Sequence, residues 1–151
     1  PGVVRYFGCR DAAMETPIRT GVADVQPVVR GCLVALLQTI PSLDVVGEAS
    51  DGDTAVRLVH EHRPDVVLMD VRMPGMDGVE ATRRIREQTP GCRVLILTMY
   101  DDDATVFTAM KAGAQGYLLK ESEQDDIVRA VHAVVAGEAI FGPGVAVRVL
   151  G

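Results

Sequence analysis

The chain has 151 residues, of which 48% are hydrophobic and 24% charged, and its formal net charge at pH 7 is −6. This suits one globular domain with a sizeable core, and the acidic balance argues against nucleic-acid binding through a basic surface. No uninterrupted apolar run reaches the ~18 residues that a membrane helix needs. Cys9, Cys32 and Cys92 are widely spaced and form no CxxC pattern, which predicts free thiols in a reducing cytoplasm.

The first 15 residues fit no regular pattern. Met14 is a candidate natural start, and residues 1–13 would then be an upstream or vector-derived segment. We therefore expect residues 1–15 to be a tail that is disordered or ordered only by crystal contacts, in preference to a functional arm, followed by one domain over residues 16–137. Residues 138–151 include a Gly-Pro-Gly stretch and are expected to begin a linker to an output domain that this chain lacks.

From Ile18 onward, apolar runs alternate with helical patterns five times. The predicted strands are 19–23, 43–49, 65–70, 93–98 and 116–119, and the predicted helices are 27–39, about 51–63, 79–87, 101–112 and 125–136. Thr20 and Gly21 make the first strand the weakest of the set. Such alternation predicts an α/β fold with a parallel sheet covered by helices on both faces. The flavodoxin-like, doubly wound five-stranded order 2-1-3-4-5 is the leading candidate.

Asp70 is the most informative single residue. The apolar run 66–69 leads directly into it, and a turn rich in Pro and Gly follows, which is typical of a strand buried on both faces. Asp70 is therefore expected at the carboxyl end of a central strand, where open parallel sheets bind their ligands. A carboxylate there can act as a nucleophile or a metal ligand. Asp77 precedes a helical pattern instead and is predicted to cap that helix.

Polar residues are predicted at the ends of four strands: Asp24, Asp70, Thr98 and Lys120. Because these ends face one crevice, the side chains are expected to meet there. Two acids, a hydroxyl and an ammonium suit a phosphoryl group handled with a divalent cation such as magnesium, Mg²⁺. Asp70 could attack phosphorus, while Lys120 offsets charge on the phosphoryl oxygens and Thr98 donates a hydrogen bond to one of them.

Several short motifs resemble the receiver domain of bacterial two-component response regulators, most closely the NarL/FixJ subfamily, whose full-length members carry a LuxR-type helix-turn-helix. The similarity covers about residues 18–137. The motifs are Pro27-Val28-Val29-Arg30-Gly31, Val45-Val46-Gly47-Glu48-Ala49, Asp70-Val71-Arg72-Met73-Pro74, Leu97-Thr98-Met99-Tyr100 and Gly116-Tyr117-Leu118-Leu119-Lys120-Glu121. Together they are far more specific than any one of them alone.

The resemblance implies a role for each matching residue. Asp70 would accept a phosphoryl group from a sensor histidine kinase, and Asp24, Asp70 and the backbone carbonyl of Arg72 would bind the metal. Thr98 would be the switch hydroxyl and Lys120 the phosphate-binding lysine.

Three further positions are implied at the rim and in the switch. The rotamer of Tyr117 would track activation, whereas Arg72 and Tyr100 occupy variable positions that tune dephosphorylation in relatives. The expected output is a change in homodimerisation. In relatives this controls transcription, and nucleic acid would be contacted only through the helix-turn-helix domain that this chain lacks.

The metal pair departs from the family pattern. Receiver domains usually carry two adjacent acids after the first strand, but this chain has Asp24-Val25, followed by Gln26 where the subfamily often has His. Loss of one carboxylate should weaken Mg²⁺ binding, because ligand charge sets affinity. Two functions therefore remain open: a phosphorylation switch, or an atypical receiver that acts as a phosphorylation-independent interaction or dimerisation module.

An enzyme is the third class considered. Phosphatases with an aspartate nucleophile resemble a DxD arrangement, but the sequence here is Asp70-Val71-Arg72. A flavodoxin would need a Ser/Thr/Gly-rich phosphate loop after the first strand, and none follows it. We expect no enzyme beyond self-catalysed phosphorylation and dephosphorylation of Asp70.

Overall fold

The computed structural model describes residues 2–7, 17–99 and 102–141. In chain order its elements are β1 (Val4–Tyr6), β2 (Ile18–Ala23), α1 (Pro27–Gln38), β3 (Leu43–Ala49), α2 (Gly52–His62), β4 (Val66–Met69), α3 (Gly78–Gln88), β5 (Arg93–Thr98), α4 (Asp103–Ala112), β6 (Gly116–Leu119), α5 (Gln124–Val135) and β7 (Ile140–Phe141). Every predicted strand and helix is present, so the prediction of alternating elements is confirmed.

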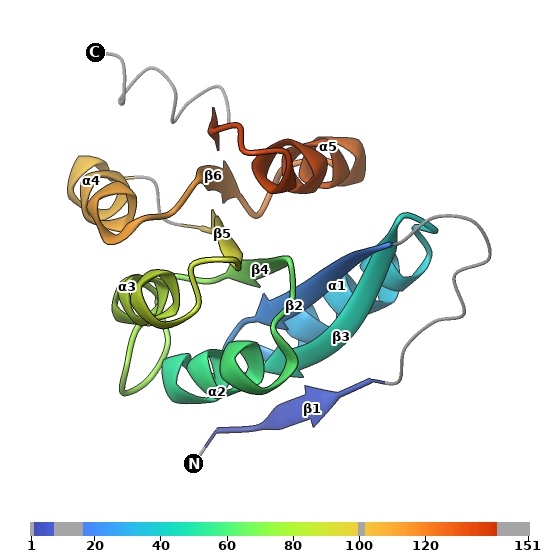
Figure 1. The fold of residues 1–151 in the computed structure, drawn as a ribbon, viewed down its shortest axis with the longest axis horizontal. Helices are drawn as coiled ribbons and strands as arrows, with labels where there is room; N and C mark the ends of the chain where they lie inside the picture. Colours follow the sequence, from blue (N-terminus) through green and yellow to red (C-terminus); the bar gives the residue numbers. More distant parts are fainter. Residues whose placement is uncertain (1, 8–16, 100–101, 142–151) are drawn as a thin grey trace.

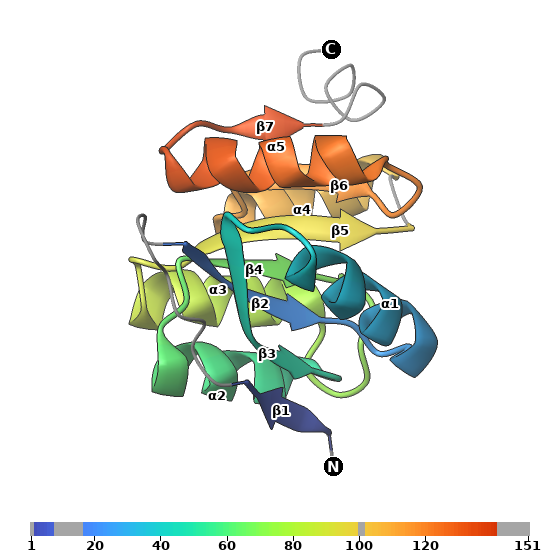
Figure 2. The ribbon, with the colours of Figure 1, turned by 90° about the vertical axis from the view of Figure 1, so that its right-hand side faces the viewer.

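The strands form one seven-stranded sheet in the order β1-β3-β2-β4-β5-β6-β7. Its five central strands are parallel, and their order is the predicted 2-1-3-4-5. Helices α1 and α5 cover one face, while α2, α3 and α4 cover the other (Figure 1, Figure 2). The doubly wound, flavodoxin-like α/β architecture is therefore confirmed.

Strand β4 explains why the sheet needs helices on both faces. Its four side chains are at most 1% exposed, and they alternate between two hydrophobic clusters. Val67 and Met69 join the cluster under α2, α3 and α4, whereas Val66 and Leu68 join the cluster under α1 and α5. A strand that is apolar at every position can bury itself only between two layers.

The weak first strand, β2, owes its composition to close packing. A Cβ atom at Gly21 would lie 3.1 Å from Cδ2 of Leu58 on α2, so a larger residue there would push against that helix. The register between β2 and β3 also shifts between Thr20 and Gly21, and the buried Thr20 hydroxyl donates to the carbonyl of Ile18 at 3.1 Å. The small and polar residues that weaken the sequence pattern fit this irregularity.

The expectation for the N-terminal extension is wrong in part. Instead of a tail without structure, Val4–Tyr6 forms β1, which pairs antiparallel with β3 at the edge of the sheet. The ring of Tyr6 lies 4.1 Å from that of His62, and its hydroxyl donates to Glu61 at 2.7 Å. The sequence did not predict this strand because three residues are too few to show a periodicity. Its pairing partners on β3 also follow about forty positions later in the chain. Residues 8–16, including Met14, lie outside the described part.

The start of the C-terminal segment belongs to the sheet. Ile140–Phe141, within the segment expected to be a linker, pairs parallel with β6 as β7, and residues 142–151 lie outside the described part.

Cys32 and Cys92 are free, as predicted, whereas Cys9 is among the residues not described. Across the described ranges, no helix combines the length and the apolar character needed to cross a membrane.

Candidate functional site

The four predicted site residues lie at one edge of the sheet. Asp24 follows β2, Asp70 follows β4, Thr98 ends β5 and Lys120 follows β6. These strands are parallel neighbours, so their carboxyl ends share an edge. Asp24, Asp70 and Thr98 are buried, and Lys120 is half-buried. Their predicted convergence is confirmed, while their chemical roles stay predictions.

Lys120 bridges the two carboxylates. Its Nζ atom lies 2.7 Å from Oδ2 of Asp24 and 3.0 Å from Oδ2 of Asp70. Burial disfavours the charged ammonium, but the hydrogen bonds to Asp24 and Asp70 outweigh this and raise the pKa of Lys120. The two carboxylates therefore stabilise the charged form of the Lys120 ammonium.

Asp70 differs from Asp24 in having an unused oxygen. Its Oδ1 atom is buried and has no hydrogen-bond partner, a costly arrangement for a carboxylate oxygen. Burial raises the pKa of Asp70, the charge of Asp24 adds to the rise, and hydrogen bonds from Lys120 and Thr98 oppose it. Oδ1 of Asp70 is thus a buried acceptor that a cation or an electrophilic atom would satisfy.

Both oxygens of Asp24 are already engaged. Its Oδ1 atom accepts from the backbone N–H of Gln26 at 2.9 Å, and its Oδ2 atom contacts Lys120. The backbone carbonyl of Asp24 accepts from Nη1 of Arg30 at 2.8 Å. Val25, which stands where the family usually has a second acid, is 36% exposed and offers no ligand atom.

The turn after β4 is shaped by Gly78 and Asp77. A Cβ atom at Gly78 would lie 1.9 Å from the carbonyl oxygen of Asp70, so only glycine lets α3 begin so close to the site. The amide of Gly78 donates to the carbonyl of Val71 at 2.7 Å. Oδ1 of Asp77 accepts from the amide of Glu80 at 2.9 Å, which confirms Asp77 as the helix cap. Asp70 and Asp77 therefore have the different environments that the sequence predicted.

The residues predicted for switching and rate tuning lie around this centre. Tyr117, on β6, is fully buried in the cluster that also contains Val106 and Ala109 of α4. Arg72 is exposed at the rim, whereas Tyr100 lies outside the described residues. The position of Tyr117 is compatible with coupling to α4, and the roles of all three residues stay predictions.

A cation at this site would have few carboxylates to bind. Among the described residues, no group of three or more His, Cys, Asp or Glu side chains is placed to hold a metal ion. The two carboxylates, the unpartnered Oδ1 of Asp70 and the backbone carbonyl of Arg72 are nevertheless the oxygen ligands that Mg²⁺ prefers. The residues present therefore fit a hard cation, with one acid fewer than the usual set.

Two hollows lie near the site. One, of about 450 Å³, is lined by Val25, Arg30 and Pro74 among others. The other, of about 400 Å³, is lined by Met99 and Lys120 among others. Only the second of these two hollows is lined by one of the four site residues, Lys120.

Sequence reasoning missed three residues that shape the site, namely Arg30, Glu48 and Gly78. Glu48 had a usable signal, because a charged residue inside the apolar run of β3 is unusual in a buried strand. Arg30 contacts Glu48 with its Nε atom at 3.3 Å. No sequence signal identified the role of Gly78, since that role depends on where α3 meets the Asp70 carbonyl.

Comparison with known proteins supports a single family. The family described as "Response regulator receiver domain" matches residues 21–132. The transcriptional regulatory protein LiaR of Bacillus subtilis is 43% identical over 133 residues, covering 88% of this chain and 63% of that protein. The transcriptional regulatory protein DegU of Brevibacillus brevis is 40% identical over 131 residues, covering 87% of this chain and 56% of that protein. The chain thus spans about three fifths of the length of these curated relatives.

Solved structures agree with this assignment. A LuxR-family two-component response regulator from Aurantimonas sp. SI85-9A1 has a TM-score of 0.84 and 38% identity, covering 89% of this chain and 96% of that one. The signal receiver domain of the response regulator NarL from Mycobacterium tuberculosis has a TM-score of 0.79 and 40% identity, covering 82% of this chain and all of that one.

Proposed function

Because the chain belongs to the response regulator receiver domain family, with NarL- and LuxR-type regulators among its relatives, we propose that it is a phosphorylation switch whose acceptor is Asp70. The observation that carries this proposal is the buried Oδ1 of Asp70, which has no hydrogen-bond partner, beside an ammonium 3.0 Å from the other oxygen of the same carboxylate. The donor would be a sensor histidine kinase, as in two-component signalling.

The chemistry is a transfer of one phosphoryl group. Oδ1 of Asp70 attacks phosphorus, the bond from phosphorus to the donor's leaving atom breaks, and the electron pair leaves with the donor. Lys120 then shifts part of its interaction from the carboxylates to the phosphoryl oxygens, and the Thr98 hydroxyl donates to one of them. Asp70 must be ionised to attack, and because burial raises its pKa, the reactive form becomes more populated as the pH rises.

Asp24, Asp70 and the carbonyl of Arg72 would hold Mg²⁺ in this reaction. The cation, when bound, offsets the negative charge that gathers on the phosphoryl oxygens. Because Val25 supplies no carboxylate, we expect weaker Mg²⁺ binding than in a receiver with two adjacent acids.

The output of the switch would be a change in dimerisation. A phosphoryl group that Thr98 contacts would pull β5 and the neighbouring Tyr117 toward a second arrangement. The face formed by α4, β6 and α5 would repack in response, because the two states differ in their phosphate contacts. Transcriptional control would then pass to a DNA-binding domain of the kind that the longer relatives' regulator names suggest.

The deciding experiment is intact-protein mass after incubation with acetyl phosphate and Mg²⁺. We expect the parent to gain one phosphoryl group and the Asp70→Asn variant to gain none. Labelling that persists in Asp70→Asn would refute Asp70 as the acceptor.

A phosphorylation-independent interaction module is the second candidate. It is favoured by Val25 in the metal pair and by Lys120, which already contacts both carboxylates. This function predicts no mass gain in the parent but a gain in Val25→Asp, which restores the missing acid. Calorimetric titration with Mg²⁺ alone separates the two candidates further, because measurable binding to the parent would count against the module.

A further inference from the structure

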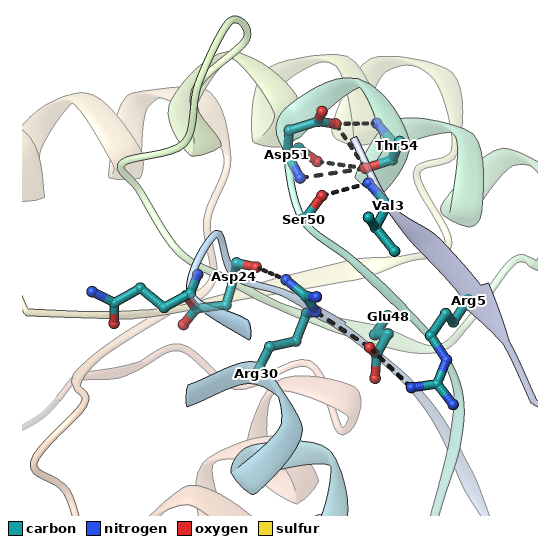
Figure 3. A network of polar contacts seen from close by, with 9 residues as sticks. Val3, Arg5, Asp24, Arg30, Glu48, Ser50, Asp51 and Thr54 are labelled. Atoms are coloured by element: carbon teal, nitrogen blue, oxygen red, sulfur yellow. Dashed lines mark hydrogen bonds and ion pairs between the residues drawn. The ribbon is translucent and has the colours of Figure 1, made fainter. Parts of the chain in front are cut away.

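A chain of polar contacts links the N-terminal strand to Asp24 (Figure 3). Its centre is the ion pair between Arg30 on α1 and Glu48 on β3, with Nε and Oε1 3.3 Å apart and side chains that are 8% and 5% exposed. Neither residue takes part in the phosphoryl chemistry proposed above. A buried charge pair away from the reacting groups needs another explanation, because desolvating both charges is costly.

Arg30 connects Glu48 to the candidate site. One edge of its guanidinium faces Glu48, while Nη1 donates to the backbone carbonyl of Asp24 at 2.8 Å. The planar guanidinium fixes the angle between these two directions. The position of Asp24, and with it the carboxylate that contacts Lys120, therefore depends on where Glu48 holds Arg30.

Strand β1 lies against the same glutamate. Arg5 pairs with Glu48 in the β1–β3 register, and its Nη1 atom lies 3.7 Å from Oε1 of Glu48. Figure 3 shows Arg5 and Arg30 approaching Glu48 from opposite sides. A Cβ atom at Gly47 would lie 2.6 Å from the carbonyl oxygen of Arg5, so the missing side chain at 47 is what lets β1 approach β3.

The attachment continues to the start of α2. The amide of Val3 donates to Oγ of Ser50 at 2.6 Å, and the amide of Ser50 donates to the carbonyl of Val3 at 2.8 Å. Asp51 follows and caps α2 by accepting from the amide of Thr54 at 2.8 Å. The N-terminal segment is therefore hydrogen-bonded both to the edge of β3 and to the loop that leads into α2.

We propose that the edge of β3 is a strand-binding surface coupled to the candidate site through Glu48 and Arg30, and that β1 is its occupant. An unpaired edge offers a row of free N–H and C=O groups to an extended segment. A three-residue strand makes few contacts, so it can leave the edge at low cost. When β1 leaves, Glu48 loses Arg5 and is exposed to water, Arg30 is held less firmly, and the Asp24 loop loosens.

Coupling of this kind is reciprocal. If β1 favours the ordered Asp24 loop, then a ligand that orders this loop must favour docking of β1 by the same factor. The effect on phosphorylation rests on the proposed function, whereas the effect on the loop does not.

The first test is Arg5→Gln, with Arg129→Gln as the matched control. Arg129 forms an exposed pair of similar length with Asp126, 3.6 Å, on α5. The readout is amide hydrogen exchange at Gln26, whose N–H is held by Oδ1 of Asp24. Because Arg5 is 63% exposed on its side chain, we expect exchange to quicken by only about three-fold, with no change in Arg129→Gln. Equal exchange in the two variants overturns the proposal.

The second test is Glu48→Gln, which keeps a hydrogen-bond acceptor and removes the buried charge. We expect a larger effect at Gln26, about ten-fold. Adding Arg5→Gln to this variant should change little more, because both act through the same carboxylate. Additive effects would overturn the proposed route. Should Glu48→Gln fail to fold, the Arg5→Gln comparison still decides.

Acetyl phosphate labelling of the same variants separates this inference from the proposed function. We expect labelling of Arg5→Gln to slow by about three-fold relative to the parent. If Gln26 exchange responds as expected but no variant, the parent included, gains a phosphoryl group, then the switch function fails while the coupling stands. Unchanged exchange together with normal labelling overturns the coupling and leaves the switch intact.

Discussion

Replacing Lys120 with Met tests the electrostatics of the site most directly. Lys120 is the cation that contacts both carboxylates, at 2.7 Å from Asp24 and 3.0 Å from Asp70. Met keeps much of the side-chain volume and removes the charge. The variant would leave two buried carboxylates side by side without a counter-ion, which should destabilise the fold.

The size of this effect follows from the burial of the three groups. Removing one member of a buried ion pair costs about 3–5 kcal/mol. The Lys120 side chain is 14% exposed, so water can reach the carboxylates left behind. We therefore expect the free energy of unfolding to fall by about 2–4 kcal/mol at neutral pH.

The loss should depend on pH. Burial already raises the pKa of Asp70 in the parent, and losing the Lys120 hydrogen bond raises it further. A carboxyl whose pKa is raised on folding binds its proton more tightly in the folded state. Stability therefore falls as pH rises from the unfolded pKa through the folded one. Acid should partly rescue Lys120→Met, because protonation of Asp70 removes the repulsion with Asp24.

Urea unfolding followed by far-UV circular dichroism measures both effects, at about pH 5 and about pH 8. Lys111→Met is the control, since Lys111 is exposed on α4 and its Nζ atom lies 5.3 Å from the centre of the Phe107 ring, away from the site carboxylates. A loss below about 1 kcal/mol, or an equal loss at both pH values, would show that the carboxylates do not depend on Lys120.

Three further predictions concern stability and reactivity. Gly78→Ala should lower the free energy of unfolding by about 3 kcal/mol or more, because the new Cβ would meet the Asp70 carbonyl; near-parental urea unfolding would contradict this packing. Asp77→Ala should cost about 1 kcal/mol through the lost cap of α3, whereas Asp77→Asn should cost less. Burial raises the pKa of the Cys92 thiol to about 12, so peptide mapping after thiol labelling at about pH 8 should find Cys32 modified and Cys92 unmodified; labelled Cys92 in folded protein would refute its burial.

Local sequence predicts the central strands well for a physical reason. A strand buried between two helical layers must be apolar at successive positions, so β3, β5 and β6 begin and end at the predicted residues. The cap at Asp77 was equally readable, because it depends on a backbone amide only three residues away. By contrast, Thr20 and Gly21 make β2 look weak until the packing of Leu58 is known.

The candidate site likewise has features that the local sequence predicts and features that depend on packing. The sequence by itself determined that Asp24, Asp70, Thr98 and Lys120 would end parallel strands, and parallel strands bring their ends together. Only the tertiary structure decided which atoms meet: that Lys120 contacts both carboxylates and that Oδ1 of Asp70 stays unpartnered.

The N-terminal strand is the clearest case of a feature that only the tertiary structure decided. β1 has no local signal, and the charge of Glu48 within β3 does not identify Arg30 as its partner, because each contact joins separate segments of the chain. Burial patterns and caps are set by neighbours within a few residues and can be read from sequence. Edge pairing, buried charge networks and pKa shifts are set by distant residues that become neighbours only when the sheet has formed.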